Sequence, residues 1–195
     1  MSEPASDEYL QTHTVGELKP LSRPICIADY DPDWPYRFER EAGIIRSALD
    51  NRALRLEHIG STSVPTLPAK PIIDIVLAVA DSANEPAYAP ALERAGYRLR
   101  VREPGWHEHR LFKGAETDVN LHVFSSGCSE IERMLAFRDW LRVNTIDREL
   151  YARCKRALVQ QDWKYTQNYA DAKTSVIEEI LSRALNSGLT GGICG

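Results

Sequence analysis

The chain has 195 residues with 43% hydrophobic and 27% charged side chains, an ordinary composition for one globular domain with a single core. Its net charge of -4 argues against a nucleic-acid backbone as the main partner, because such binders usually carry a concentrated positive surface. No apolar run approaches the roughly 20 residues that cross a bilayer, and the N-terminus is acidic rather than signal-like. Four scattered cysteines form no metal or redox motif. We therefore expect free thiols and a cytoplasmic protein that binds neither membranes nor nucleic acid.

The N-terminal part predicts a leader followed by a strand and a long helix. Residues 1–22 are polar and mixed in charge, which is typical of a flexible leader. A short strand is expected around residues 25–27, and Asp33 is well placed to cap a helix. Apolar side chains at steps of three to four through residues 34–49 predict that this helix packs on a sheet.

The next part combines two strands with a polar loop. Residues 54–59 are a strand candidate that leads into the loop at 60–63, and residues 72–79 are apolar on both alternating faces, as a strand buried from both sides should be. Asp74 lies in the middle of the second strand. Because a buried unpaired carboxylate is costly, Asp74 either belongs to a phosphate and metal site or hydrogen-bonds to loop amides near the strand end.

A second group of strands follows. The pattern predicts a helix and three strands, at residues 85–95, 97–101, 111–113 and 118–124. In the last of these strands Asp118, Asn120 and His122 share one face by alternation. A half-polar strand can simply face solvent. If its polar face is the one that carries Asp74, however, the two acids and the histidine line a single cleft.

The C-terminal third reads as helices. Ser129 followed by Glu132 is a capping-box signature, and Asp147 can cap a second helix. A third helix places Lys173 one turn after Tyr169. The expected organisation is a core at 23–126, a helical part packed on it at 127–186 and a glycine-rich flexible tail at 187–195.

Several segments together resemble the GrpB family. They are YDPDWPYRFE at 30–39, EHIGSTSVP followed by AKPIIDI at 57–75, NLHVF at 120–124, and YARCKRAL followed by the Tyr169 to Lys173 pair. The long HIGSTSVP…KPIIDI motif is highly specific. That family is assigned to the nucleotidyltransferase superfamily and also occurs fused to some bacterial dephospho-CoA kinases. The resemblance implies an α+β (mixed α/β) fold, with a nucleotidyltransferase-like mixed sheet and packed helices.

The resemblance also implies a nucleotide site. In nucleotidyltransferases a Gly-Ser pair at a helix N-terminus holds the triphosphate through backbone N–H groups and the helix dipole. The candidate nucleotide-binding residues are Gly60, Ser61, Thr62, Ser63, His58, Lys70, Arg110 and Lys113. Of the cations Lys70 is preferred, because it lies within the motif, and His58 either contacts substrate or braces the loop. Thr66 stands where the family's proline loop has glycine, which predicts a stiffer or altered turn.

The catalytic centre implied by the superfamily consists of carboxylates that bind magnesium. Two carboxylates stand two residues apart on the strand after the loop, with a third on a neighbouring strand. Asp74 matches the first position, and Val76 occupies the second. Asp74 and Asp118 are therefore expected to hold one Mg²⁺, with water and phosphate oxygens as the other ligands. His122 is a candidate base or phosphate ligand, or else a hydrogen-bonded strand histidine.

Two functions remain open. The first is magnesium-dependent nucleotidyl transfer from a nucleoside triphosphate to a small acceptor, with Asp74, Asp118 and His122 as the catalytic residues. The second is a non-catalytic module that binds a nucleotide, a CoA precursor or another phosphate-bearing small molecule. Val76 at the second carboxylate position favours the second function.

Overall fold

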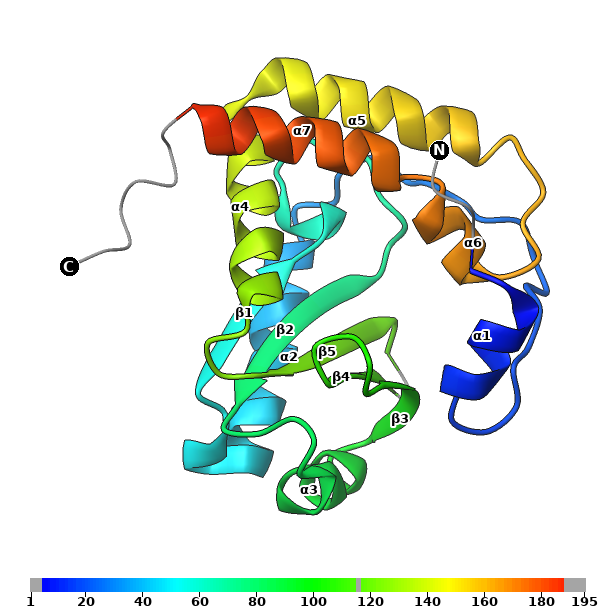
Figure 1. Cartoon of the computed structure of the whole chain (residues 1–195). Coiled ribbons are helices and arrows are strands. Elements are labelled where there is room, and N and C mark those ends of the chain that lie inside the picture. Colours follow the sequence, from blue (N-terminus) through cyan, green and yellow to red (C-terminus); the bar gives the residue numbers. More distant parts are fainter. Residues whose placement is uncertain (1–4, 115–116, 188–195) are drawn as a thin grey trace.

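The fold is built on one mixed β-sheet, seen in a computed structural model that describes residues 5–114 and 117–187 (Figure 1). Its five strands lie in the order β1-β2-β5-β4-β3. β2 and β5 are parallel, and the other neighbouring pairs are antiparallel. The strands are β1 (Arg55–Ile59), β2 (Ile73–Val79), β3 (Tyr97–Glu103), β4 (His109–Gly114) and β5 (Val119–Ser125). The expected α+β class with a mixed sheet is confirmed.

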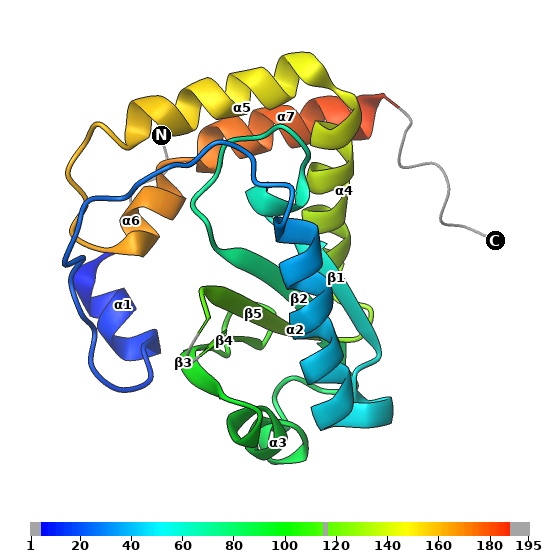
Figure 2. The same cartoon turned by 180° about the vertical axis from the view of Figure 1, so that it is seen from behind.

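Helices cover both faces of this sheet. They are α1 (Asp7–His13), α2 (Trp34–Leu49), α3 (Ala89–Arg94), α4 (Ser129–Val143), α5 (Thr145–Leu158), α6 (Thr166–Asp171) and α7 (Thr174–Asn186). Figure 2 shows α2 in front of the sheet, whereas Figure 1 shows the other face, along which α4 runs. α5 and α7 lie side by side across one end of the sheet in both views. None of the helices in the described part of the chain is long and apolar enough to span a membrane.

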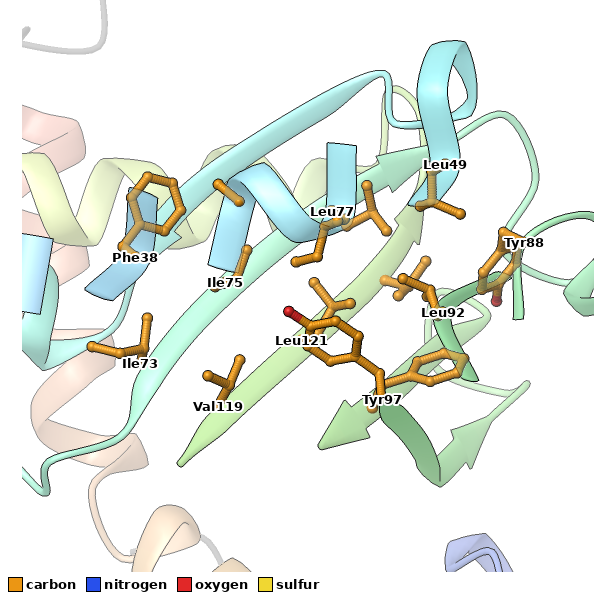
Figure 3. Packing of buried hydrophobic residues seen from close by; sticks show 14 of the residues in the cluster. Phe38, Leu49, Ile73, Ile75, Leu77, Tyr88, Leu92, Tyr97, Val119 and Leu121 are labelled. Atoms are coloured by element: carbon orange, nitrogen blue, oxygen red, sulfur yellow. The ribbon is translucent and has the colours of Figure 1, made fainter. Parts of the chain in front are cut away.

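The main hydrophobic core lies between the sheet and α2 with α3 (Figure 3). The predicted apolar stripe of α2 is buried throughout, at Trp34, Phe38, Ala42, Ile45 and Leu49. Ile73, Ile75 and Leu77 of β2 point into the same core. Because side chains alternate along a strand, Asp74 is placed on the opposite face, the one away from α2.

Smaller apolar clusters attach the C-terminal helices to that opposite face. Val76 and Phe124 of the sheet pack against Ile131 and Leu135 of α4. A further cluster joins the proline loop to α5 and α7, and contains Val64, Leu67, Leu141, Tyr151, Ala152, Val176 and Ile180. The C-terminal helices therefore lie directly over the loop that contains the Gly-Ser segment.

The predicted flexible leader is wrong for much of its length. Residues 7–13 form α1, which begins at the N-cap Ser6, whose side chain accepts a hydrogen bond from the backbone N–H of Tyr9. The chain after α1 then pairs with β3 through a bridge between Thr14 and Val101. Leu10 is the buried apolar residue of this helix, so the sequence carries no apolar period that would reveal it. The predicted tail falls mostly on residues 188–195, outside the described part of the chain.

Other element boundaries differ for local reasons. The strand expected at 25–27 is replaced by a single bridge between Ala28 and Ala69. The last helix is divided into α6 and α7. The three expected caps also differ. Asp33 stands at the N-cap of α2 but makes no side-chain cap hydrogen bond, and α4 is preceded by Cys128, likewise without one. Asn144, not Asp147, caps α5 by accepting from the N–H of Asp147.

Candidate functional site

Asp74 lies against the Gly60 backbone on the sheet face that α2 does not cover. A Cβ atom at Gly60 would come within 2.4 Å of Asp74 Oδ2, and Gly60 has φ +68°, a conformation that L side chains rarely adopt. Asp74 Oδ1 accepts a hydrogen bond of 2.7 Å from Asn120 Nδ2. The glycine is therefore required by the close approach of this carboxyl group, and the partner of the carboxyl is a side-chain amide on β5 rather than a loop amide.

Three lysines from separate elements act on this carboxyl through their charges. Lys70 precedes β2, Lys113 lies on β4, and Lys173 lies just before α7. Burial raises the pKa of the Asp74 carboxyl, while the Asn120 hydrogen bond and the charges of Lys173, Lys70 and Lys113 act in the opposite direction. Burial likewise lowers the pKa of Lys173 to about 8, although the charge of Asp74 favours its ammonium form. We call Asp74, Asn120, His122, Lys70, Lys113 and Lys173 together the Asp74 site.

His122 shares this face, as the alternation of β5 predicts. In the parallel register Asp74 is opposite Asn120 and Val76 is opposite His122. His122 Nε2 lies 4.0 Å from Asp74 Oδ1, and the two side chains are 22% and 27% exposed. Burial, with the charges of His109 and Lys113, lowers the pKa of His122 to about 3. His122 is thus a neutral, partly accessible imidazole next to a carboxyl group.

The other predicted residues are divided between the two faces. Burial and the charge of Lys113 lower the pKa of Lys70, whereas the charges of Asp74 and Asp118 raise it, so Asp118 acts on the same group of cations. Asp118 is exposed and lies just before β5. Arg110 does not belong with these cations, because it lies on the other face of the sheet. It forms ion pairs with Glu85 at 2.6 Å and Glu108 at 3.2 Å, and it pairs with Val123, whose side chain lies in the α2-side core.

Two of the loop hydroxyls hold the loop itself. Thr62 Oγ1 donates to the carbonyl of Ile72 at 3.0 Å, and Ser63 Oγ donates to the carbonyl of Gly60 at 2.6 Å. Because the Thr62 proton is used, His58 Nε2 must donate across its 3.0 Å contact with Thr62 Oγ1. His58 also stacks on Phe38 with ring centroids 4.9 Å apart. Of its two expected roles, His58 has that of a brace for the loop.

Ser61 contacts a buried lysine that sequence reasoning did not select. Lys155 of α5 is 3% exposed, and its Nζ donates to Ser61 Oγ at 2.9 Å and to the carbonyl of Pro68. Burial, reinforced by the charge of Lys173, lowers the pKa of Lys155 to about 7. Arg142 of α4 also donates to the carbonyl of Ser63. The C-terminal helices therefore fix the Gly-Ser segment in place. The YARCKRAL segment marked this region, but nothing in it singled out Lys155.

Tyr169 and Lys173, noted as a pair from their spacing, are in direct contact. Lys173 Nζ lies 4.4 Å from the centre of the Tyr169 ring, a cation–π distance. Tyr169 is 3% exposed, so its ring is a fixed platform for the ammonium group. Through this contact the ammonium group of Lys173, which belongs to the helical part, is held where its charge acts on Asp74 of the sheet.

The described side chains do not build a resident magnesium site. Among residues 5–114 and 117–187, no group of three or more His, Cys, Asp or Glu side chains could hold a metal ion. Val76, at the second carboxylate position, is 1% exposed and packs with Phe124. Asp74 faces three ammonium groups, which repel a cation. Magnesium at Asp74 and Asp118 therefore has no complete ligand set among this chain's own described residues.

Thr66, which stands where the family's proline loop has glycine, adopts a backbone conformation with positive φ. Its φ is +66°, so the turn keeps a left-handed conformation that suits glycine and is unfavourable for a β-branched residue. The turn is strained, and its residue is exposed. The expectation of a stiffened or altered turn thus has a specific cause in the backbone at this position.

The fold and site define an α+β protein in which a glycine loop, a carboxyl group and three lysines meet on one face of a mixed sheet under C-terminal helices. The chain belongs to the GrpB family, whose pattern ("GrpB protein") matches residues 24–183. It is 62% identical to "UPF0157 protein BH1888" of Halalkalibacterium halodurans over 94% of both chains. The crystal structure of conserved protein GrpB from Enterococcus faecalis superposes with a TM-score of 0.73 at 33% identity, covering 83% of this chain and 98% of that one.

More distant likenesses were also found. A dephospho-CoA kinase of Mycolicibacterium paratuberculosis is 28% identical over 76% of this chain, which spans 43% of the kinase. The Cid1 poly(U) polymerase, in the structure of its mutant bound to MgATP, aligns with a TM-score of 0.42 at 12% identity, over 67% of this chain and 45% of the polymerase. A likeness at that level carries no argument about ligand or reaction.

Proposed function

We propose that the Asp74 site binds the phosphate groups of a nucleoside triphosphate and transfers the nucleoside monophosphate to the hydroxyl group of a small acceptor. The observation that carries the proposal is that the charges of Lys70, Lys113 and Lys173 all act on one partly buried carboxyl, which packs against Gly60 of the Gly-Ser loop. Even with Asp118 counted, positive charges exceed negative ones here. Lys70 and Lys173 are partly buried, and ammonium groups removed from water need anionic partners, of which a polyphosphate supplies several.

The proposed reaction uses the groups that the sheet presents. The acceptor oxygen attacks the α-phosphorus, and its proton passes to the neutral Nε2 of His122. The bond from the α-phosphorus to the bridging oxygen breaks, and pyrophosphate leaves. The lysines bind and orient the phosphates, which is most of what catalysis of phosphoryl transfer requires. Magnesium enters the proposal only as an ion carried by the nucleotide, and no step is assigned to it.

The first experiment measures nucleotide binding by thermal shift. A ligand present at about 100 times its Kd stabilises the folded state by roughly 2.7 kcal/mol, which raises the Tm of a chain of this size by about 5–11 °C. We expect this rise with nucleoside triphosphates and not with the corresponding nucleosides. It should be lost in Lys173→Met and kept in the control Lys19→Met, since Lys19 is 71% exposed and pairs with Glu17.

The second experiment measures turnover as pyrophosphate release, with a broad pool of small hydroxyl-bearing metabolites and with or without magnesium. We expect release from the wild type and none from Asp74→Ala, with the fold of the variant intact by circular dichroism. If no triphosphate stabilises the wild type, the proposal is abandoned altogether.

The alternative function is a non-catalytic module that binds a nucleotide or a CoA precursor. The buried Val76 at the second carboxylate position specifically favours it. Stabilisation by nucleotides that is independent of magnesium and unaccompanied by pyrophosphate release would select this alternative. The lysine variants would then weaken binding without any effect on a reaction.

A further inference from the structure

A row of hydrogen-bonded side chains crosses the sheet and ends at His122. Glu103, the last residue of β3, lies opposite His109, the first residue of β4. Glu103 Oε2 is 2.7 Å from His109 Nδ1, and His109 Nε2 is 3.1 Å from His122 Nδ1. The two imidazole rings are stacked, with centroids 5.2 Å apart. We call Glu103, His109 and His122 the relay.

The relay is enclosed on most sides. His109 is stacked on Phe124 at 4.8 Å and meets the edge of Trp106 at 5.2 Å, and its side chain is 5% exposed. The other oxygen of Glu103 accepts a hydrogen bond of 2.9 Å from the Tyr9 hydroxyl of α1. At its other end, the relay comes within 4.0 Å of Asp74 Oδ1 through His122 Nε2. The relay thus contacts α1 at its Glu103 end and the Asp74 site at its His122 end.

The chemistry of the groups fixes the direction of the hydrogen bonds. A carboxylate only accepts, so Glu103 requires a proton on His109 Nδ1. In its neutral form His109 has a single N–H, the one on Nδ1, and its Nε2 then accepts. Its partner His122 Nδ1 then donates, which leaves the lone pair of His122 Nε2 directed toward Asp74.

That lone pair faces a second acceptor. His122 Nε2 and Asp74 Oδ1 are 4.0 Å apart, too far for a hydrogen bond, and neither carries a proton when the carboxyl is ionised. Two acceptors at this separation favour a donor group near them. The hydroxyl group of a substrate has the required O–H.

We propose that Glu103 and His109 are positioning residues that hold His122 in the Nδ1–H tautomer, so that its Nε2 accepts the proton of an acceptor hydroxyl group. This inference rests on the proposed function for the identity of the reaction. The principle is that of a base whose second ring nitrogen is oriented by another group. Here that group is a second histidine, which is itself oriented by a carboxylate, and the residues come from three adjacent strands.

The test is the tautomer of His122 in the nucleotide-free full-length protein, read from long-range ¹H–¹⁵N spectra at about pH 8, above the ordinary histidine pKa. The His122 signals are assigned by their loss in His122→Gln. We expect the proton on Nδ1 in the wild type. A wild-type proton on Nε2, or a doubly protonated His109, overturns the proposal even if neither Glu103→Gln nor Tyr9→Phe folds.

Glu103→Gln should reverse the relay. The Tyr9 hydroxyl favours the amide oxygen on its side, so the amide NH₂ faces His109 Nδ1 and donates to it. The His109 proton then moves to Nε2, and the His122 proton moves to Nε2 in turn. The control Tyr9→Phe keeps the carboxylate and should leave the His122 tautomer as in the wild type. An unchanged tautomer in Glu103→Gln contradicts the positioning role.

Chemical modification provides a second readout that requires no turnover. Diethyl pyrocarbonate acylates imidazole nitrogens that carry a lone pair. His122 should react several-fold more slowly in Glu103→Gln than in Tyr9→Phe, as measured by peptide mass spectrometry, because its free lone pair is then buried against His109. Equal rates overturn the proposal. Failure of the nucleotide titrations would refute the proposed function alone, since both readouts are taken without nucleotide.

Discussion

Gly60→Ala tests the packing of the Asp74 carboxyl on the glycine loop. The new Cβ would lie 2.4 Å from Asp74 Oδ2 and 3.0 Å from Asp74 Cβ, in a backbone with φ +68°. The left-handed conformation costs an L residue about 1–2 kcal/mol, and forcing an atom into a packed site costs about 1–3 kcal/mol. We expect a total loss near 2–4 kcal/mol, because alanine recovers about 0.4–1 kcal/mol through the unfolded chain.

The measurement is chemical denaturation together with thermal melting. For a chain of this size the loss corresponds to a Tm lower by on the order of 10 °C. Gly43→Ala is the matched control, since nothing lies within 4 Å of a Cβ there and a helical Gly-to-Ala change stabilises by about 0.5–1 kcal/mol.

A double-mutant cycle separates the two costs of Gly60→Ala. In an Asp74→Ala background the contacts with the carboxyl group disappear, and the 3.0 Å contact with the Cβ of residue 74 and the backbone cost remain, so the cycle should give a coupling of about 1–3 kcal/mol. A Gly60→Ala protein as stable as the wild type, or a cycle with no coupling, would refute the packing argument.

Three further variants test the loop and its supports. Thr66→Gly should stabilise by about 0.5–1 kcal/mol in urea denaturation, because relief of about 1–2 kcal/mol of left-handed strain exceeds the entropic cost of glycine, about 0.5–1 kcal/mol; any destabilisation argues against a strained turn. Lys155→Met should remove a pH dependence of the folding stability. Burial lowers the pKa of Lys155 from 10.5 to about 7, so between pH 7 and 10.5 the unfolded state binds one proton more than the folded state. Wild-type stability should then rise with pH by up to about 1.4 kcal/mol per unit relative to the variant, and parallel curves would contradict it. His58→Phe keeps the stack on Phe38 and loses the hydrogen bond to Thr62, at a cost of about 0.5–1.5 kcal/mol near neutral pH. Because burial, with the charges of Arg142 and Arg138, lowers the pKa of His58 from 6.5 to about 4, the wild type loses stability as pH falls across that range. The difference in folding stability between the wild type and His58→Phe should therefore become smaller as the pH falls. A difference that does not change with pH would exclude a neutral, buried His58.

Elements with a strong apolar period could be predicted from the sequence. The spacing of apolar side chains in α2 and β2 shows which faces must be buried, and these faces were predicted correctly. The shared face of Asp74 and His122 also followed from alternation, once β2 and β5 were neighbours. Arg110 was misplaced because sequence proximity to Lys113 does not fix its face: three residues apart on a strand are on opposite sides.

Side chains that meet only through tertiary structure were missed. Glu103 precedes a Pro-Gly turn and reads as a loop residue, yet the β3–β4 register, with an irregularity between Leu99 and Val101, places it beside His109. α1 was missed because polar contacts hold it, such as Tyr9 to Glu103. Its signal was local: a serine N-cap followed by two acidic residues in the first turn.

Lys155 was missed for a related reason. A lysine within a helical pattern is usually solvated, and only the packing of α5 on the proline loop buries this one and brings it to Ser61. The burial of Lys155 was therefore beyond a pattern of single residues, whereas Lys70, the Gly-Ser loop and the Asp74 carboxyl were found directly.

The most direct test of the central claim is a crystal soaked with a nucleoside triphosphate and manganese. We expect phosphate density between Lys70, Lys113 and Lys173 beside Asp74. The anomalous signal of manganese would show whether a metal ion accompanies the phosphates. Ordered nucleotide bound elsewhere, for example in the surface groove lined by Arg40, Ile44 and Arg94, with the three lysines unengaged, would contradict it.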